Sequence, residues 1–379
     1  FCFANMKSGQ LQINELRNIL NEHFHWHKAR LDCFVSMLLA LLAVNTVNLT
    51  QLAVSFPSRA LISSRYRRMQ RFFSEHWIDY DDVAWFIMRL FGFTDSDYYL
   101  SLDRTNWKWG KININLLVLA VVYRGAAIPV YWLPLNKRGN SNSRERIALL
   151  KRFIDQFGRD PIKGILADRE FIGDQWLGWL LEQKIPFTIR IRNNCYTTNA
   201  QGERIRVDQL FYTLNPGEER IIRDARKLGR HRVHISGLRL SDGEMLIVVS
   251  DHFEPQAIQI YGLRWEIETL FGCLKGRGFK LEETRVVGYL RIKKLLVLPV
   301  IAFCWCHKIG EWKHTCILPI KIKTHNRRAQ SLFRYGLDAI RSEILNLFTT
   351  SKKLLLIMIS ILRPSLPDPV RNNLSLCAR

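Results

Sequence analysis

A polar stripe on one predicted helix carries the side chains best suited to chemistry. Its members are spaced three, four and seven residues apart: Tyr261, Arg264, Glu268 and Lys275. At ~100° per residue, the four side chains fall within about 60° of one another on a helix face. A carboxylate beside an arginine, a lysine and a phenol could join a metal ligand to groups that hold a phosphate. A solvated helix face with a stabilising Arg–Glu pair would show the same spacing.

Two aspartates complete a set of three carboxylates. Asp103 follows the apolar alternation of residues 99–102, and Asp168 follows the apolar run 164–167. Both are expected at strand ends, where a carboxylate beside apolar residues is costly unless its charge is compensated. Mg²⁺ prefers carboxylate oxygens in proteins. Asp103, Asp168 and Glu268 would supply ligands for two Mg²⁺ or Mn²⁺ ions about 4 Å apart, which could activate a water or a 3′ hydroxyl.

The order of the predicted elements indicates a ribonuclease H-like α/β fold with a mixed sheet and flanking helices. Three strands, expected as an antiparallel meander, precede a helix, a strand and a second helix: 98–103, 113–123, 128–133, 140–157, 162–167 and 173–183. In this fold the first and fourth strands are neighbours. We therefore expect Asp103 and Asp168 to emerge at the same edge of the sheet.

The flanking sequence differs in character from this α/β segment. Residues 7–93 show helical periodicity, whereas residues 187–249 contain closely spaced turn signals and short alternating runs. We expect a helical DNA-binding module at 1–93, a first part of the catalytic domain at 94–186, a β-rich insertion at 187–254, a second catalytic part at 255–312 and a helical C-terminal tail at 313–379.

A helix-turn-helix-like arrangement is predicted in the N-terminal module. A short helix capped near Asn48 stops at Pro57, and a second helix is expected over residues 64–73. The second helix carries four arginines that we predict to contact DNA: Arg65, Arg67, Arg68 and Arg71. A cationic, solvated helix on the outside of a bundle is the alternative.

The charge of the chain points to a polyanionic partner. Lysine and arginine outnumber aspartate and glutamate by 56 to 34 over 379 residues, giving a formal charge of +22. Double-stranded DNA is the leading candidate, although a ribosomal-type or membrane-surface protein could have the same balance. The apolar runs at 35–44 and 295–306 are shorter than the ~20 residues of a membrane span. We expect them to be buried helices and expect no membrane partner.

The cysteines and histidines do not form a convincing metal motif. The eight cysteines lack the spacing of a disulfide framework, which favours a reducing, cytoplasmic setting. Cys304, Cys306 and His307 lie close together in an apolar run, without a second Cys/His pair at zinc-ligand spacing. Buried thiols are therefore the preferred interpretation.

Three segments together resemble a known family. The spacing from Tyr261 to Lys275 matches the YREK motif of bacterial insertion-sequence transposases, and the segments around Asp103 and Asp168 resemble their first two catalytic motifs. The resemblance implies a catalytic triad of Asp103, Asp168 and Glu268 that cuts element ends and joins their 3′ hydroxyls to target DNA. It also implies that Tyr261, Arg264 and Lys275 contact the end DNA, and that the protein acts as a nucleoid-associated homodimer on DNA.

The resemblance has one departure and leaves two rivals. The best-known relatives carry a tryptophan in the β insertion that stacks on a flipped base, whereas the candidates in this insertion are Tyr196, Phe211 and Tyr212. A ribonuclease H-like nuclease or resolvase would cut without strand transfer. A DNA-binding descendant would not cut at all.

Overall fold

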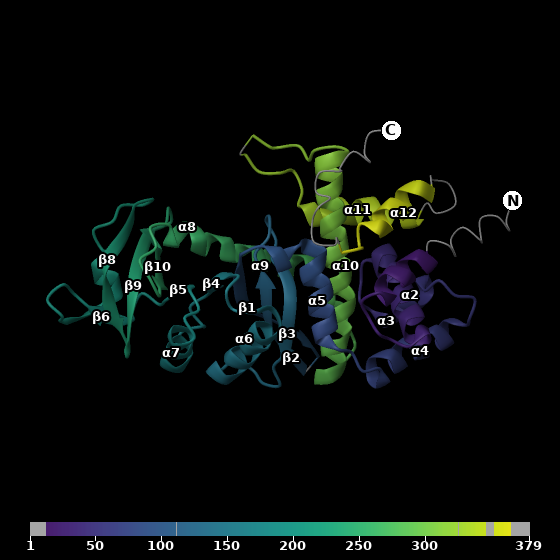
Figure 1. Cartoon of the computed structure of the whole chain (residues 1–379), viewed down its shortest axis with the longest axis horizontal. Coiled ribbons are helices and arrows are strands. Elements are labelled where there is room, and N and C mark those ends of the chain that lie inside the picture. Colours follow the sequence, from purple (N-terminus) through teal and green to yellow (C-terminus); the bar gives the residue numbers. More distant parts are fainter. Residues whose placement is uncertain (1–12, 111, 325, 346–351, 365–379) are drawn as a thin grey trace. The chain divides into compact units, whose positions relative to one another are not determined.

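The computed structural model describes residues 13–110, 112–324, 326–345 and 352–364 (Figure 1). The chain divides into two compact units. The first takes its residues from 1–95, 107–114 and 271–379, and the second from 96–106 and 115–270. We call them the helical unit and the sheet unit. The boundaries between the two units fall within strands β1 (Tyr98–Trp109) and β2 (Ile112–Val121) and within helix α9 (Glu266–Leu274).

An eight-stranded sheet dominates the sheet unit, with the strand order β3-β2-β1-β4-β5-β10-β9-β8 (Figure 1). Its strands are β1 (Tyr98–Trp109), β2 (Ile112–Val121), β3 (Ile128–Pro134), β4 (Ile162–Ala167), β5 (Phe187–Arg190), β8 (Glu219–Leu228), β9 (His231–Arg239) and β10 (Met245–Ser250). Strands β6 (Tyr196–Thr198) and β7 (Arg204–Arg206) form a separate antiparallel pair. The sheet is mixed: β1, β4 and β5 are parallel, whereas β2 and β3 are antiparallel, as are β5, β10, β9 and β8.

The first four strands have the predicted ribonuclease H-like order. β4 lies beside β1 in parallel, with Leu102 opposite Ala167. Leu102 and Ala167 are fully buried, as expected for strands covered on both faces. Helices α6 (Ser143–Phe157) and α7 (Asp174–Glu182) contact each other, and α6 also contacts β3. The capping box of Asn142 and Glu145 begins α6, which confirms the predicted start of that helix.

Two elements differ from the prediction. β1 continues to Trp109, so Asp103 lies inside the strand and only its pairing with β4 ends there. The strand continues because its second half pairs with β2, its other neighbour in the sheet. The β-rich segment 187–254 begins with β5, which pairs with β4 in parallel, and β10 then pairs with β5. The insertion therefore extends the central sheet, with only β6 and β7 outside it.

The last part of the sheet unit is helical and ends within α9. The helix predicted to carry Tyr261, Arg264, Glu268 and Lys275 is broken into α8 (Ala257–Gly262), a 3-10 turn η3 (Leu263–Trp265) and α9 (Glu266–Leu274). Ile267, Leu270 and Leu274 are buried, whereas the Leu263 side chain is exposed. The 3-10 turn changes the direction of the side chains, and its effect on the candidate site is described below.

The helical unit packs around one long helix, α10 (Tyr289–Cys316). Its other helices include α2 (Lys28–Val44), α3 (Leu49–Ser55), α4 (Ile62–Glu75), α5 (Tyr80–Phe91), α11 (Leu332–Leu345) and α12 (Lys352–Ser360). α10 contacts α2, α4, α5 and α11. The α10–α11 contact depends on glycine, because a Cβ on Gly310 or Gly336 would overlap backbone atoms of the facing helix.

The apolar runs of the sequence are buried within this unit. Cys304, Cys306 and His307 lie in α10 and are fully buried or nearly so, and burial raises the pKa of both thiols. Among the described residues, no single helix has the length and apolar character of a membrane span. By length and composition alone, the helix pair α2 and α3 meets the requirement together, with a bend of 98° between them.

Candidate active site

Register in the sheet places two of the predicted carboxylates side by side. Asp103 and Asp168 each follow the last paired residues of β1 and β4, Leu102 and Ala167. The carboxylate of Asp103 accepts a hydrogen bond from the Arg104 backbone N–H at 2.7 Å, and Asp168 accepts one from its own next residue at 2.7 Å. The backbone of each strand therefore orients its aspartate, as the sequence predicts for acids at one sheet edge.

Arg264 connects Asp103 to Glu268. Its Nη1 donates to Asp103 Oδ2 at 3.0 Å, and its Nη2 donates to Glu268 Oε1 at 2.7 Å. The Arg264 side chain is only 4% exposed, whereas the side chains of Asp103 and Glu268 are 16% and 43% exposed. One buried guanidinium therefore holds the strand carboxylate and the helix carboxylate in one cluster, with Glu268 on the solvent side.

Tyr261 extends the cluster to the second aspartate. Its hydroxyl accepts a hydrogen bond from Arg264 Nε at 3.1 Å and donates to Asp168 Oδ1 at 3.5 Å. Burial raises the pKa of Tyr261 to about 12, so the phenol keeps its proton and can act as a donor. Tyr261 and Arg264, which were expected to contact DNA, thus lie buried among the three carboxylates.

The pKa of Asp103 is raised mainly because the carboxyl group is buried. The pKa lies at about 6, and the nearby carboxylates of Asp168 and Glu170 act in the same direction as burial. The Arg104 backbone N–H and the Arg264 guanidinium lower it, but they do not cancel the effect of burial. A further cation beside Asp103 would therefore favour its ionised form.

The break at η3 explains how this cluster forms. Arg264 lies within the 3-10 turn and is buried, whereas its neighbour Trp265 is 57% exposed. Glu266 accepts hydrogen bonds from the backbone N–H groups of Tyr123 and Gly125 at 2.6 and 2.7 Å. Glu266 thereby fixes the start of α9 to the β2–β3 turn and points away from the cluster, as its spacing from Glu268 predicts.

Lys275 belongs to the helical unit and makes its contacts there. It lies one residue beyond α9, and its Nζ pairs with Glu282 Oε1 at 3.3 Å. The same ammonium lies 5.8 Å from the ring centroid of Trp107, within the range of a cation–π contact. The structure therefore brings Tyr261, Arg264 and Glu268 together in the sheet unit, whereas Lys275 is assigned to the helical unit.

Glu170 has a role that the sequence analysis did not assign. The Arg104 side chain binds its carboxylate through Nε and Nη2, at 3.1–3.3 Å. Arg104 Nη1 also donates to Asn115 Oδ1 at 3.0 Å. Arg104 follows Asp103, and Glu170 comes two residues after Asp168. The Arg104–Glu170 ion pair thus ties together the two backbone segments that carry the aspartates. The pairing of β1 with β4 was the signal from which this ion pair could have been predicted.

The four arginines of α4 separate into two groups. Arg65 donates to the backbone carbonyls of Ala60, Ala53 and Val54. Arg68 donates to the Ala29 carbonyl in the first turn of α2 and lies 5.8 Å from the Phe56 ring centroid. Arg67 and Arg71 are exposed. Two of the arginines therefore stabilise the helical unit, and the other two face solvent.

The candidate aromatic residues of the β insertion differ in exposure. Phe211 is fully buried, and its ring lies where a Cβ on Gly237 would be. Tyr196 and Tyr212 are 52% and 73% exposed. The Arg204 guanidinium lies 4.0 Å from the centroid of the Tyr196 ring. Phe211 is therefore part of the core, and the two tyrosines are the accessible rings.

The donor set of the cluster fits a hard divalent cation. Asp103, Asp168 and Glu268 offer carboxylate oxygens, which Mg²⁺ and Mn²⁺ favour. Within the parts of the chain that the structure describes, no group of three or more His, Cys, Asp or Glu side chains is placed to hold a metal ion. In this arrangement Arg264 binds an oxygen of Asp103 and one of Glu268, so the carboxylates are paired with a guanidinium.

The three clustered carboxylates lie within a domain that a known family model matches. The model of the transposase DDE domain matches residues 96–305, which is more than half of the chain and includes Asp103, Asp168 and Glu268. The chain belongs to this family.

The other comparisons add less. No curated protein matches the chain. Among solved structures, the chain is similar to the piggyBac transposase in a cryo-EM structure of its synaptic complex with hairpin DNA. The sequence identity is 12% and the TM-score 0.43, and the match covers 92% of this chain and 80% of the piggyBac chain.

Proposed function

We propose that this protein is an insertion-sequence DNA transposase that cleaves the ends of its element and joins the freed 3′ hydroxyls to target DNA. The observation that carries the proposal is the convergence of Asp103, Asp168 and the Arg264-bound Glu268 within the matched domain. The positive charge of the chain, +22, supports a DNA partner. Assignment to the bacterial families with the YREK motif follows from the spacing of Tyr261, Arg264, Glu268 and Lys275.

Asp103, Asp168 and Glu268 would hold the metal ions in this proposal. When bound, Mg²⁺ or Mn²⁺ supplies Lewis-acid activation of a water or hydroxyl and stabilises the leaving oxygen. The protein's own contribution is orientation. The backbone N–H groups fix both aspartates, and Arg264 draws Glu268 toward Asp103. The buried, protonated Tyr261 donates to Asp168 and so restricts its rotation.

Cleavage of the element's own ends tests this proposal. The substrate is a labelled duplex containing the terminal sequence that flanks the gene, incubated with the full chain and Mg²⁺ or Mn²⁺. Asp103→Asn, Asp168→Asn and Glu268→Gln should each abolish cleavage and leave end binding largely intact. Asp160→Asn is the matched control, because its side chain is 91% exposed and pairs with the adjacent Arg159.

The products of the reaction separate the proposal from its rivals. Joining of the labelled 3′ end to a supercoiled plasmid supports a transposase. Cleavage without joining would favour a nuclease or resolvase. Binding without metal-dependent cleavage would favour a DNA-binding descendant. Substantial nicking by any one of the three variants would remove that residue from the catalytic set.

A further inference from the structure

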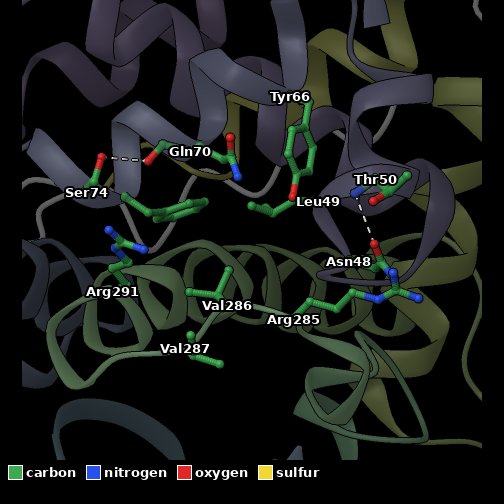
Figure 2. Close-up of a pocket in the computed structure, with 11 residues that line it drawn as sticks. Asn48, Leu49, Thr50, Tyr66, Gln70, Ser74, Arg285, Val286, Val287 and Arg291 are labelled. Carbon is green, nitrogen blue, oxygen red and sulfur yellow. Dashed lines mark hydrogen bonds between the residues drawn. The ribbon is translucent and has the colours of Figure 1, made fainter. Parts of the chain in front are cut away.

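A pocket of ≈ 300 Å³ lies within the helical unit and is lined by none of the residues of the candidate active site. One wall comes from α4, through Tyr66, Gln70 and Ser74, and the opposite wall comes from the segment that leads into α10 (Figure 2). Arg285 and Arg291 belong to this second wall. Figure 2 shows both arginines on the side of the pocket that faces α4.

The walls are fixed by local contacts. Asn48 caps α3 by accepting from the Thr50 backbone N–H at 3.0 Å, and both residues line one end of the pocket. The Thr284 hydroxyl accepts from the Val286 backbone N–H at 3.1 Å, and Thr284 is fully buried. The Arg285 guanidinium lies 5.7 Å from the Trp109 ring centroid, so it is held at the pocket's side by a cation–π contact.

The pocket is positively charged. Among the described residues that line it, two are arginines and none is acidic. The neighbouring Lys294 donates to the backbone carbonyl of Ser74 at 3.3 Å. Burial lowers the pKa of Lys294, and the charge of Arg291 lowers it further. A polyanion with accessible oxygens is therefore the ligand that this surface favours electrostatically.

The exposed arginines of α4 lie on the same helix face as the pocket wall. Arg67, Gln70, Arg71 and Ser74 fall within about 100° of one another at ~100° per residue. Arg67 and Arg71 are exposed. A chain of phosphates that entered the pocket could therefore continue along this face of α4 to two further guanidinium groups.

We propose that this pocket binds the sugar–phosphate backbone of one DNA strand, with Arg285 and Arg291 on successive phosphates and the polar groups of Tyr66 and Gln70 beside the sugar. The inference rests on the proposed function, since it takes the element's DNA as the ligand. Contacts of this kind fix the position and register of a protein on DNA without reading its sequence. The pocket would thus anchor the strand while other groups recognise the end.

Salt-dependent binding of the full chain measures the contribution of the two arginines. The probe is a fluorescein-labelled duplex of the flanking terminal sequence, with an unrelated duplex of equal length, both followed by anisotropy in metal-free buffer. Each phosphate contact contributes about −0.9 to the slope of log K against log salt. In the Arg285→Ala/Arg291→Ala variant, the slope should therefore become less negative by about 1.8 on both duplexes. An unchanged slope would overturn the proposal.

A charge-matched variant controls for the loss of two cations. Arg327→Ala/Arg328→Ala removes two exposed arginines of the same unit that do not line the pocket. It should leave the slope close to that of the wild type. An equal change of slope in both double variants would show that net charge, and not the pocket, determines the salt dependence. That result would also overturn the proposal.

A second substitution keeps the arginines and their contact with Trp109. Gln70→Glu places a negative charge on the exposed α4 wall, and Gln183→Glu places one on an exposed position of the sheet unit. Gln70→Glu should weaken binding of both duplexes several-fold more than Gln183→Glu; equal effects would count against the pocket.

Cleavage by the wild type is scored separately. A wild type that binds but does not cut refutes the proposed function alone, whereas a wild type that cuts with an unaltered slope in the pocket variant refutes this inference alone.

Discussion

Removal of Arg264 should destabilise the sheet unit when no metal is present. Its guanidinium donates hydrogen bonds to Asp103 at 3.0 Å, to Glu268 at 2.7 Å and to the Tyr261 hydroxyl at 3.1 Å. Arg264→Ala would leave two facing carboxylates without their cation. The prediction is that the variant unfolds more easily than the wild type at neutral pH.

The size of the effect can be estimated from the burial of each contact. Removing one partner of a buried ion pair costs about 3–5 kcal/mol, because the remaining charge stays desolvated. The Asp103 side chain is 16% exposed and belongs to this class, whereas Glu268 is 43% exposed and adds at most about 1 kcal/mol. Protonation of Asp103, whose pKa is already about 6, would relieve part of the cost. We therefore expect a net loss of about 3 kcal/mol.

Thermal unfolding followed by circular dichroism measures this loss. For a unit of this size, a change of 1 kcal/mol shifts Tm by roughly 2–4 °C, so Arg264→Ala should lower Tm by about 6–12 °C. Added Mg²⁺ should raise Tm more in the variant than in the wild type, because the carboxylates then lack a competing guanidinium. Arg264→Lys keeps the charge but cannot bind two carboxylates in the same bidentate geometry. Its Tm should lie between those of the wild type and Arg264→Ala.

The double variant Asp103→Asn/Arg264→Ala is the control for this reasoning. Without the Asp103 charge, loss of Arg264 should cost much less, and the additional response to Mg²⁺ should disappear. If Arg264→Ala alone unfolds at the wild-type temperature in metal-free buffer, the ion pairs do not stabilise the unit. If the double variant still gains from Mg²⁺, the ion is binding elsewhere.

Three further outcomes are expected. Glu170→Gln should leave end binding unchanged but slow single-turnover cleavage up to about 100-fold, because loss of the Arg104 pair lets the aspartate-bearing segments shift. Gly336→Ala should lower the urea midpoint of the helical unit strongly, since a Cβ there overlaps backbone atoms of α10, whereas Gly276→Ala meets nothing within 4 Å and should be mild. Burial lowers the pKa of His76 to about 4 from 6.5. The unfolded chain therefore binds the proton first, and the stability of the helical unit should fall as pH drops from 6.5 toward 4. His76→Gln should flatten this pH dependence of Tm.

The strands could be predicted from the sequence because their pattern is local. The short apolar run 164–167, followed by an aspartate, predicts both β4 and the position of Asp168, and the order of elements then predicts that β1 lies beside it. The continuation of β1 to Trp109 was not predicted. Strand alternation also could not reveal that β5 joins β4, since a strand that extends a sheet has the same residue pattern as one in a separate module.

Contacts between distant segments account for what the sequence did not reveal. A helical wheel places Arg264 on a solvated stripe, but the 3-10 turn and the carboxylate of Asp103 draw it into the interior. The charges of α4 were likewise visible, but the sequence could not show that Arg65 and Arg68 are occupied by backbone carbonyls. Helix periodicity predicts which face a residue occupies; it does not predict which partner the residue finds there.

The charges of the candidate site give a physical reason for its expected dependence on metal. The carboxylates of Asp103 and Glu268 bind the guanidinium of Arg264, and the carboxylate of Asp168 joins the cluster through the Tyr261 hydroxyl. With all three ionised, three negative charges against one positive charge leave a deficit of two. The raised pKa of Asp103 is consistent with that deficit. A DNA phosphate would add a further negative charge, and Arg264 is already engaged by two carboxylates, so phosphate binding at this edge requires additional positive charge. A divalent cation supplies it with the ligand chemistry that the carboxylates provide, whereas neutralisation by protons would remove the ligands themselves.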